Sequence, residues 1–455
     1  MSFRLGSVLE KVYFCLVQVL DNSIITLTDS EMNRQNLFRS AFLVVLMAVL
    51  SAPLARSQTK TRVLVVGTIH DGHNTNPNYS YRHLADILGT FRPDAICVEI
   101  PPSYFRKRSY LIEMMYASIY GFDNGLKVYP IDWWSPGDAR AERREYEKTD
   151  DYRKKEMKVD SLVEANEIMQ QFRNKYGSMD SIWRQNTQDY RFFNGKDYND
   201  YIREMYTILV DVFGDGCMNL YSEKRNAMMM DYINRAVDGH RGHRVIVLAG
   251  AEHKYYFDLA LSKKADVTLV TLDDILPLQP VQPTENMISL IEDGLAKGYY
   301  DTDDVYSVDV LYANALTPIL HGPGMDQDPS IVPAENIERA KPILAEWASQ
   351  KPSSVRLAFD RCWLKFLEKD FQGAISLAES VADRLDDVPS ESAWFVKSFF
   401  WRNLGFCYDL TGQRAKAVEA YRKCRSVCDK LNMNPDYAKS IYADFENEPY
   451  RDKRN

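Results

Sequence analysis

Short, largely apolar runs occur at five places along the chain and predict strands, and the two that begin at Val63 and Val245 show no polar alternation. The five runs cover residues 63–67, 95–99, 126–131, 245–249 and 267–271. A strand buried on both faces shows no alternation, so these runs are typical of a parallel sheet covered by helices. Between the first two runs, Leu84, Ile87 and Leu88 recur at helical spacing, and Pro93 ends that helix. We expect this part to form a right-handed βαβ unit.

A long helical pattern interrupts the predicted sheet. Charged and aromatic residues at helical spacing run from about residue 139 to 237, far longer than an ordinary connection between strands. We therefore expect an α/β fold, with a central, mostly parallel sheet flanked by helices and a helical insertion placed as a lid over the carboxyl edge. This domain is expected to span residues 58–280, because a proline-rich stretch begins at Pro277.

The last part of the chain has an all-helical pattern. Residues 401–421 match the tetratricopeptide pattern W-x2-L-G-x2-Y…A-x3-F. Gly405 and Ala417 are small enough to let two antiparallel helices approach closely, and residues 364–381 carry a weaker copy. Such a region is expected to bind a protein partner. We expect two helical segments here: a linking region over 281–350 and a tetratricopeptide-like region over 351–455.

The first residues carry the pattern of a secretory signal. Residues 32–39 are a short basic lead, and residues 41–52 are an apolar block too short to span a bilayer comfortably. We interpret 1–57 as an upstream extension and a signal peptide that starts at Met32 and is cleaved after Ser57, with an uncleaved anchor as the alternative. The expected destination is the periplasm or the extracellular space, with no stable membrane span after cleavage.

Composition narrows the function classes. A chain of 455 residues with 45% hydrophobic and 26% charged residues is typical of a soluble globular protein. The formal net charge is −8 and no long Lys/Arg tract occurs, which argues against nucleic-acid binding. The seven cysteines lack the spacing of a zinc knuckle or of a disulfide scaffold. The expected substrate is a peptide or a small molecule.

Two of the predicted strands end in the same pattern, Gly-x-x-His. The first copy delivers His70 and the second delivers His253, while Glu99 and Asp132 end two further strands. The carboxyl ends of parallel strands meet at one edge, where ligands bind in open α/β sheets. A single histidine is more often a buried residue whose hydrogen bonds are satisfied within the fold. Two matching copies together with two carboxylates favour a functional site.

This set of side chains allows two kinds of chemistry. His70, Glu99 and His253 are suitable ligands for a divalent transition metal such as Mn, Co, Zn or Fe, whose bound water becomes a nucleophile. Without a metal, a histidine can act as a general base, with Glu99 as its orienting or acid partner. Asp132 is expected to orient one of these histidines without itself contacting the metal or the substrate.

Arg225 is a further candidate, and the other histidines rank lower. Ser222 can cap a helix that carries Arg225 in its first turn, where a guanidinium could clamp a carboxylate or stabilise an oxyanion; the alternative is a surface ion pair. His73 is either a second ligand or a loop residue, and the loop is favoured. His240 and His243 precede the fourth strand and therefore lie at the opposite edge.

These motifs resemble the TraB/GumN family, which is grouped with Tiki proteases, erythromycin esterase-like enzymes and ChaN-like proteins. The resemblance covers residues 61–276 and rests on the Gly-x-x-His pair, the strand ending at Glu99 and the helix beginning at Glu223. It implies an exported hydrolase of peptide or ester bonds, metal-dependent as in Tiki members. The alternative that it implies is a non-catalytic protein that binds haem or a peptide in the same cleft. The implied site residues are His70, Glu99, Arg225 and His253, with Asp132 as a less specific match.

Two departures from this family pattern leave the substrate open. Trp133 and Trp134 follow Asp132 where many members continue with smaller or basic residues. The helical repeat at the carboxyl end is not part of the core family pattern either.

Overall fold

The computed structural model describes residues 59–134, 139–214, 224–301, 307–322, 327–388, 390–442 and 444–454. The predicted signal peptide and upstream extension lie outside these ranges. Met1–Gln58 and Thr59–Asn455 are separate units, and the description below concerns the second. None of the helices in the described ranges combines the length and the apolar character that crossing a membrane requires.

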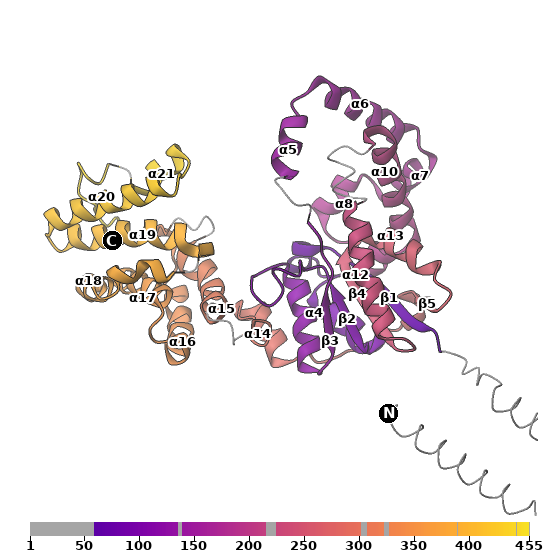
Figure 1. Cartoon of the computed structure of the whole chain (residues 1–455), viewed down its shortest axis with the longest axis horizontal. Coiled ribbons are helices and arrows are strands. Elements are labelled where there is room, and N and C mark those ends of the chain that lie inside the picture. Colours follow the sequence, from indigo (N-terminus) through magenta and orange to yellow (C-terminus); the bar gives the residue numbers. More distant parts are fainter. Residues whose placement is uncertain are drawn as a thin grey trace, which may run out of the picture. The chain divides into compact units, whose positions relative to one another are not determined.

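A five-stranded, all-parallel sheet is the core of the α/β part (Figure 1), with strand order β3-β2-β4-β1-β5. The two Gly-x-x-His strands are hydrogen-bonded neighbours, and Gly67 of β1 lies opposite Ala249 of β4. The predicted α/β class with a parallel sheet is therefore confirmed. The strands are β1 (Thr61–Thr68), β2 (Ala95–Val98), β3 (Lys127–Pro130), β4 (Arg244–Gly250) and β5 (Val267–Val270).

Helices cover both faces of this sheet, because successive strand residues point to opposite sides. One face packs with α3 (Tyr81–Phe91) and α4 (Ile112–Asp123), and the other with α12 (Arg225–Gly239) and α13 (Ala251–Ser262). This double cover explains the continuous apolar runs. The strand residues on the α3/α4 face include Leu64, Val66, Ile96, Val98, Ile246 and Leu248, and those on the α12/α13 face include Val63, Val65, Cys97, Val245 and Val247.

The helical insertion is attached to the sheet at the end of β1 and the start of α13. Asn194 accepts a hydrogen bond from the Gly67 N–H (2.7 Å) and donates to the Gly67 carbonyl (3.1 Å). Tyr206 donates to the Glu252 carboxylate over 2.8 Å. α12 falls within the same predicted stretch but packs on the sheet itself. The remaining helices of the insertion are α5 (Ala139–Tyr146), α6 (Asp150–Ala165), α7 (Glu167–Tyr176), α8 (Met179–Gln185), α9 (Tyr190–Asn194) and α10 (Lys196–Phe213).

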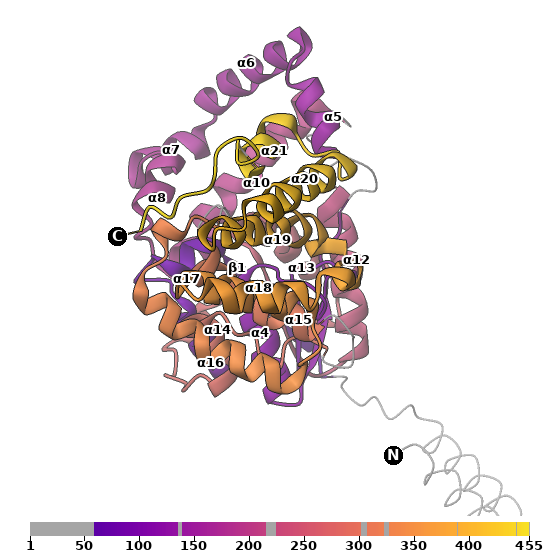
Figure 2. The same ribbon diagram turned by 90° about the vertical axis from the view of Figure 1, so that its left-hand side faces the viewer.

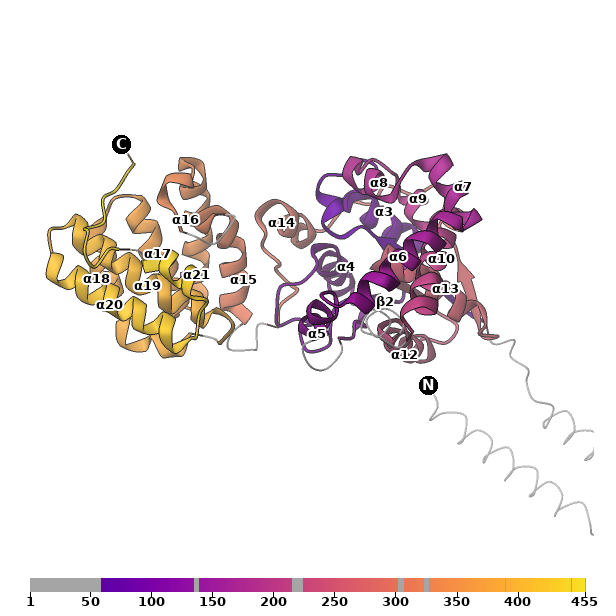
Figure 3. The same cartoon turned by 90° about the horizontal axis from the view of Figure 1, so that it is seen from above.

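The C-terminal region is helical, and from α16 onward each helix packs against the next one (Figures 2 and 3). Its strongest contact joins the two helices of the predicted tetratricopeptide-like pair, α19 and α20. The helices are α14 (Glu285–Asp293), α15 (Ser307–Leu316), α16 (Ala334–Gln350), α17 (Val355–Leu367), α18 (Phe371–Glu379), α19 (Ser390–Leu410), α20 (Arg414–Lys430) and α21 (Pro435–Tyr442).

Gly405 of α19 faces Tyr421 of α20 with no room for a side chain. A Cβ atom at Gly405 would lie 2.3 Å from the Tyr421 ring, which is fully buried. We expect Gly405→Ala to lower the free energy of unfolding by about 1–3 kcal/mol, because overpacking outweighs the gain in helix propensity. Urea denaturation measures this change. Gly239→Ala is the matched control and should be neutral, because its Cβ would meet nothing nearer than 3.8 Å; equal stability of the two variants would contradict the close approach.

Candidate functional site

Four of the five predicted site residues form one contact network around the guanidinium of Arg225. Arg225 is the first residue of α12, and its Nη2 donates to Glu99 Oε1 over 2.6 Å. Its Nε donates to Asp132 Oδ1 over 2.9 Å, and its Nη1 lies 3.3 Å from His253 Nε2. The side chains of Arg225, Glu99 and Asp132 are only 11%, 3% and 0% exposed. The sequence therefore folds an arginine onto two buried carboxylates and one imidazole.

Glu99 follows β2 directly, and both of its carboxylate oxygens are engaged. Oε1 accepts from Arg225 and lies 3.4 Å from His253 Nε2, while Oε2 accepts from the Gly250 N–H over 2.6 Å. Burial alone would raise the pKa of Glu99, but the nearby charges of His253 and Arg225 outweigh it and hold the pKa well below its usual value. Glu99 is therefore ionised at neutral pH.

Asp132 is held by aromatic side chains as well as by Arg225. Its Oδ2 accepts from the Tyr110 hydroxyl and from the Trp134 indole, each over 2.8 Å. The Trp134 ring also lies 5.2 Å from the guanidinium carbon of Arg225. We expected Asp132 to orient a histidine directly, but within the described contacts it reaches His253 through Arg225. The hydrogen bonds that Tyr110 and Trp134 donate to Asp132 were not predicted from the sequence.

His253, in the first turn of α13, is oriented by a residue that sequence reasoning missed. Its Nδ1 is hydrogen-bonded to Oδ1 of Asn226, the buried neighbour of Arg225. Because an amide oxygen only accepts, this bond places a proton on Nδ1, and Nε2 faces both the Arg225 guanidinium and the Glu99 carboxylate. The ring also stacks with Phe257, with 6.0 Å between the ring centres.

His70 lies beside this network and has its own buried carboxylate. Its Nδ1 is 2.7 Å from Oε1 of Glu113, which lies in the first turn of α4 and is 1% exposed, whereas the His70 side chain is 41% exposed. Gly250 makes room for the ring, because a Cβ there would lie 2.7 Å from His70 Nε2. The backbone of His70 is left-handed, with φ of 49°, a conformation that costs about 1–3 kcal/mol for a residue other than glycine. Glu113 could have been noticed as the single charged residue of the stretch 111–122.

The Glu113 contact predicts the titration of His70. Burial lowers the pKa of His70, but the hydrogen bond to Glu113 and the charges of Glu113 and Glu99 outweigh it and raise the pKa to about 8. We expect an NMR titration of His70 to show this midpoint in the wild type and one nearer the unperturbed value of about 6.5 in Glu113→Gln. A wild-type midpoint at the unperturbed value would contradict the pair.

The free energy of unfolding should also change with pH over the range in which His70 titrates. The folded-state pKa of His70 is raised, so its stabilising contribution is complete below the unfolded pKa of about 6.5 and is lost as the pH rises through about 8. Urea denaturation at a pH below both pKa values and at a pH above them should therefore show a larger fall in the free energy of unfolding in the wild type than in Glu113→Gln.

The hydrogen bonds and ion pairs described for His73, His240 and His243 do not reach this network. His73 is buried, with Nδ1 bonded to the Tyr79 carbonyl (2.7 Å) and Nε2 accepting from the Ile69 N–H (3.1 Å). Burial lowers its pKa to about 4, so it is neutral at neutral pH. His240 contacts the Tyr129 hydroxyl, and it precedes β4 together with His243, at the amino edge. The helix cap predicted at Ser222 lies outside the described residues.

The three side chains expected to hold a metal, His70, Glu99 and His253, are each engaged with another protein side chain. Within the described ranges, no group of three or more His, Cys, Asp or Glu side chains is placed to hold a metal ion. The Arg225 guanidinium bonds to Glu99 and adjoins His253 Nε2, so a cation between those two would meet a positive charge. Metal binding by these three residues stays a prediction, and it requires Arg225 to move away.

Comparison with known proteins adds no relative, because the chain matches no family model, no curated protein and no solved structure. The resemblance to the TraB/GumN family therefore remains an expectation from the motifs.

Proposed function

We propose that the protein is a hydrolase of ester or peptide bonds in which His70 activates water. One observation carries the proposal: a part-exposed imidazole is fixed by buried Glu113 beside the network of Glu99, Arg225 and His253. This network lies at the carboxyl edge of a parallel sheet, the edge at which such sheets bind ligands. The bond from Nδ1 to Glu113 leaves Nε2 of His70 for proton transfer.

The proposed reaction uses one histidine first as base and then as acid. Neutral His70 takes a proton from water at Nε2 while the water oxygen forms a bond to the substrate carbonyl carbon. The same proton then passes to the leaving alkoxide or amine as its bond to that carbon breaks. Glu113 accepts the Nδ1 hydrogen bond throughout and stabilises the imidazolium that forms between the two steps.

The surroundings of His70 supply the remaining roles. The first N–H groups of α13 have no acceptor within their own helix, and a helix N-terminus is suited to stabilising the developing oxyanion. Arg225 is committed to Glu99 and Asp132, so its role is to hold these carboxylates and His253 in place. This assignment replaces the substrate clamp expected for Arg225.

A substrate screen tests the proposal. Purified protein is assayed with chromogenic esters and with a fluorogenic peptide library, in the presence of a chelator. We expect hydrolysis that survives chelation and is lost in His70→Gln. Hydrolysis that the His70 variant retains would refute the assignment. Elemental analysis tests the metal route separately: a stoichiometric transition metal, lost in the His70 and His253 variants, would replace the His-activated water with a metal-bound one.

One observation favours a second function, non-catalytic binding of haem or a peptide. The charges of Glu99, Asp132 and Arg225 are satisfied by one another, so the network can equally form the rigid floor of a binding site. Titration with haem distinguishes the two functions. An absorbance shift that depends on His70, together with no hydrolysis in the screen, would support binding.

A further inference from the structure

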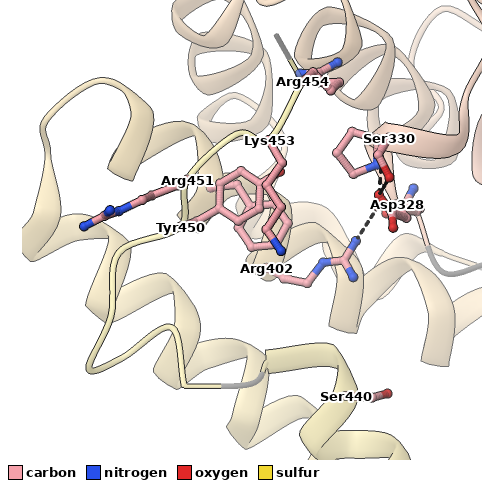
Figure 4. A pocket seen from close by; sticks show the side chains of 11 residues that line it. Asp328, Ser330, Arg402, Ser440, Tyr450, Arg451, Lys453 and Arg454 are labelled. Carbon is pink, nitrogen blue, oxygen red and sulfur yellow. Dashed lines mark hydrogen bonds between the residues drawn. The ribbon is translucent and has the colours of Figure 1, made fainter.

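The C-terminal helical region contains a second polar site, a cavity of about 390 Å³ (Figure 4). Its walls come from α19, from residues 327–330, from Ser440 of α21 and from the segment that carries Tyr450, Arg451, Lys453 and Arg454. The volume falls within the range of about 300–1,000 Å³ that small-molecule sites occupy. This cavity shares no residue with the His70 network.

Positive charge dominates the lining of this cavity. Among the described residues, four cationic side chains line it, Arg402, Arg451, Lys453 and Arg454, against one carboxylate, that of Asp328. Arg454 is neutralised by an ion pair with Asp452 at 2.7 Å. Figure 4 shows the Lys453 side chain pointing toward the Arg402 guanidinium, whereas Arg451 points away. The hydrogen bond from Ser330 and the charges of Arg402 and Lys453 hold the pKa of Asp328 below its usual value, so this carboxylate offsets part of the converging positive charge. The described lining keeps a net positive charge, which favours an anionic ligand.

Arg402 is held rigidly in this position. It is 6% exposed, and its guanidinium lies over the Phe399 ring at 4.2 Å. Its Nε and Nη2 both donate to Asn403 Oδ1, over 3.1 and 3.0 Å, and Nη2 also donates to the Gln327 carbonyl. Burial lowers the pKa of Arg402 to about 10, so the group stays positive at neutral pH.

A buried hydrogen-bond chain supports Arg402 from behind. Asn403 Nδ2 donates to Gln327 Oε1 over 2.6 Å, and the Gln327 amide bonds His321 Nδ1 over 2.7 Å. His321 Nε2 in turn bonds Asp360 over 2.6 Å. The sequence marks only a turn at His321, yet this side chain is fully buried. A satisfied buried network of this kind fixes side-chain orientation, so the positive charge of Arg402 is held rigidly in the wall of the cavity.

We propose that this cavity binds a small phosphomonoester. A phosphoryl group carries about 1.5 to 2 negative charges at neutral pH and accepts several hydrogen bonds, which suits converging arginine and lysine better than a monoanion does. The organic part of the ligand would lie against Tyr450, whose ring stacks on Phe406 with centres 3.8 Å apart. This site is independent of the proposed hydrolase activity.

Isothermal titration of the full chain with phenyl phosphate tests this inference, with benzoate as the monoanionic comparison. We expect phenyl phosphate to bind more tightly than benzoate. Lys453→Gln should raise the dissociation constant about tenfold or more, because a charge-assisted hydrogen bond is lost. Lys430→Gln is the matched control, since this exposed lysine of α20 does not line the cavity. Its affinity should equal that of the wild type.

Three results would overturn the proposal: no heat with phenyl phosphate at millimolar concentration, equal affinity for benzoate, or unchanged affinity in Lys453→Gln. Lys453 is exposed, so its replacement leaves the packing intact. Arg402→Lys keeps the charge but removes the planar fork. If this variant melts like the wild type, it should also bind phenyl phosphate more weakly, and unchanged binding would count against the proposal.

Discussion

Replacing Arg225 with alanine should lower the free energy of unfolding by about 3–5 kcal/mol, because removing one partner of a buried ion pair leaves an uncompensated charge. Here two carboxylates lose their partner: the side chains of Glu99 and Asp132 are 3% and 0% exposed, and both are bonded to the guanidinium. Urea denaturation at neutral pH measures the loss.

Two further variants show whether burial is the cause. Arg153→Ala removes an arginine from an exposed ion pair with Asp150 on α6 and should cost less than about 1 kcal/mol. The triple variant Arg225→Met, Glu99→Gln, Asp132→Asn buries no charge and should recover much of the stability that Arg225→Ala loses. If Arg225→Ala cost no more than Arg153→Ala, the buried network would be contradicted.

Replacing His70 with glutamine should reduce hydrolysis about 10²- to 10⁴-fold, the usual contribution of a positioned general base. In the wild type, kcat/KM should rise as the pH passes about 8, because His70 must lose its proton before it can act as a base. Glu113→Gln should move this rise toward about 6.5. The measurement is the pH profile of kcat/KM on a substrate from the screen.

His243→Gln is the matched control for His70. This histidine precedes β4 at the amino edge and its side chain is 62% exposed, so its replacement should leave activity unchanged. Activity that falls as the pH passes through the His70 pKa would contradict the role of His70 as a base. Glu99→Gln would also disturb the Arg225 network, so a variant of the part-exposed His70 is the sharper probe of catalysis.

The strands, and the sheet edge at which the site residues lie, were predictable because a strand buried on both faces has a continuous apolar sequence. Val63–Val66 and Val245–Leu248 are continuous apolar runs, and a histidine three positions after each glycine has to lie near the carboxyl edge. Local pattern therefore fixed which residues end strands. It also placed Glu99 in the network with His253, although 154 residues separate them in the chain.

The hydrogen-bond partners of these strand-end residues depend on packing between helices far apart in the chain. Such packing produces no pattern in the nearby sequence. Glu113 meets His70 only because α4 covers the sheet face beside the end of β1, and Asn226 meets His253 only because α12 and α13 lie on the same face. The bonds of Arg225 to two carboxylates also depend on packing between elements that are far apart in the chain. A sequence shows that an arginine is present, but the fold decides whether its charge is already balanced.

The position of β4 between β1 and β2 also has a consequence for how the chain is made. β1 and β2 are synthesised early but do not pair with each other. β2 can pair with β3 soon after it is made, whereas the place between β1 and β2 stays empty until β4 follows. About 150 residues separate the ends of β2 and β4, so at roughly 5–20 residues per second the edge of β2 that will receive β4 stays unpaired on the nascent chain for about 8–30 s. Sheet closure is therefore a late event of high contact order, and it creates the His70–His253 edge in the same step.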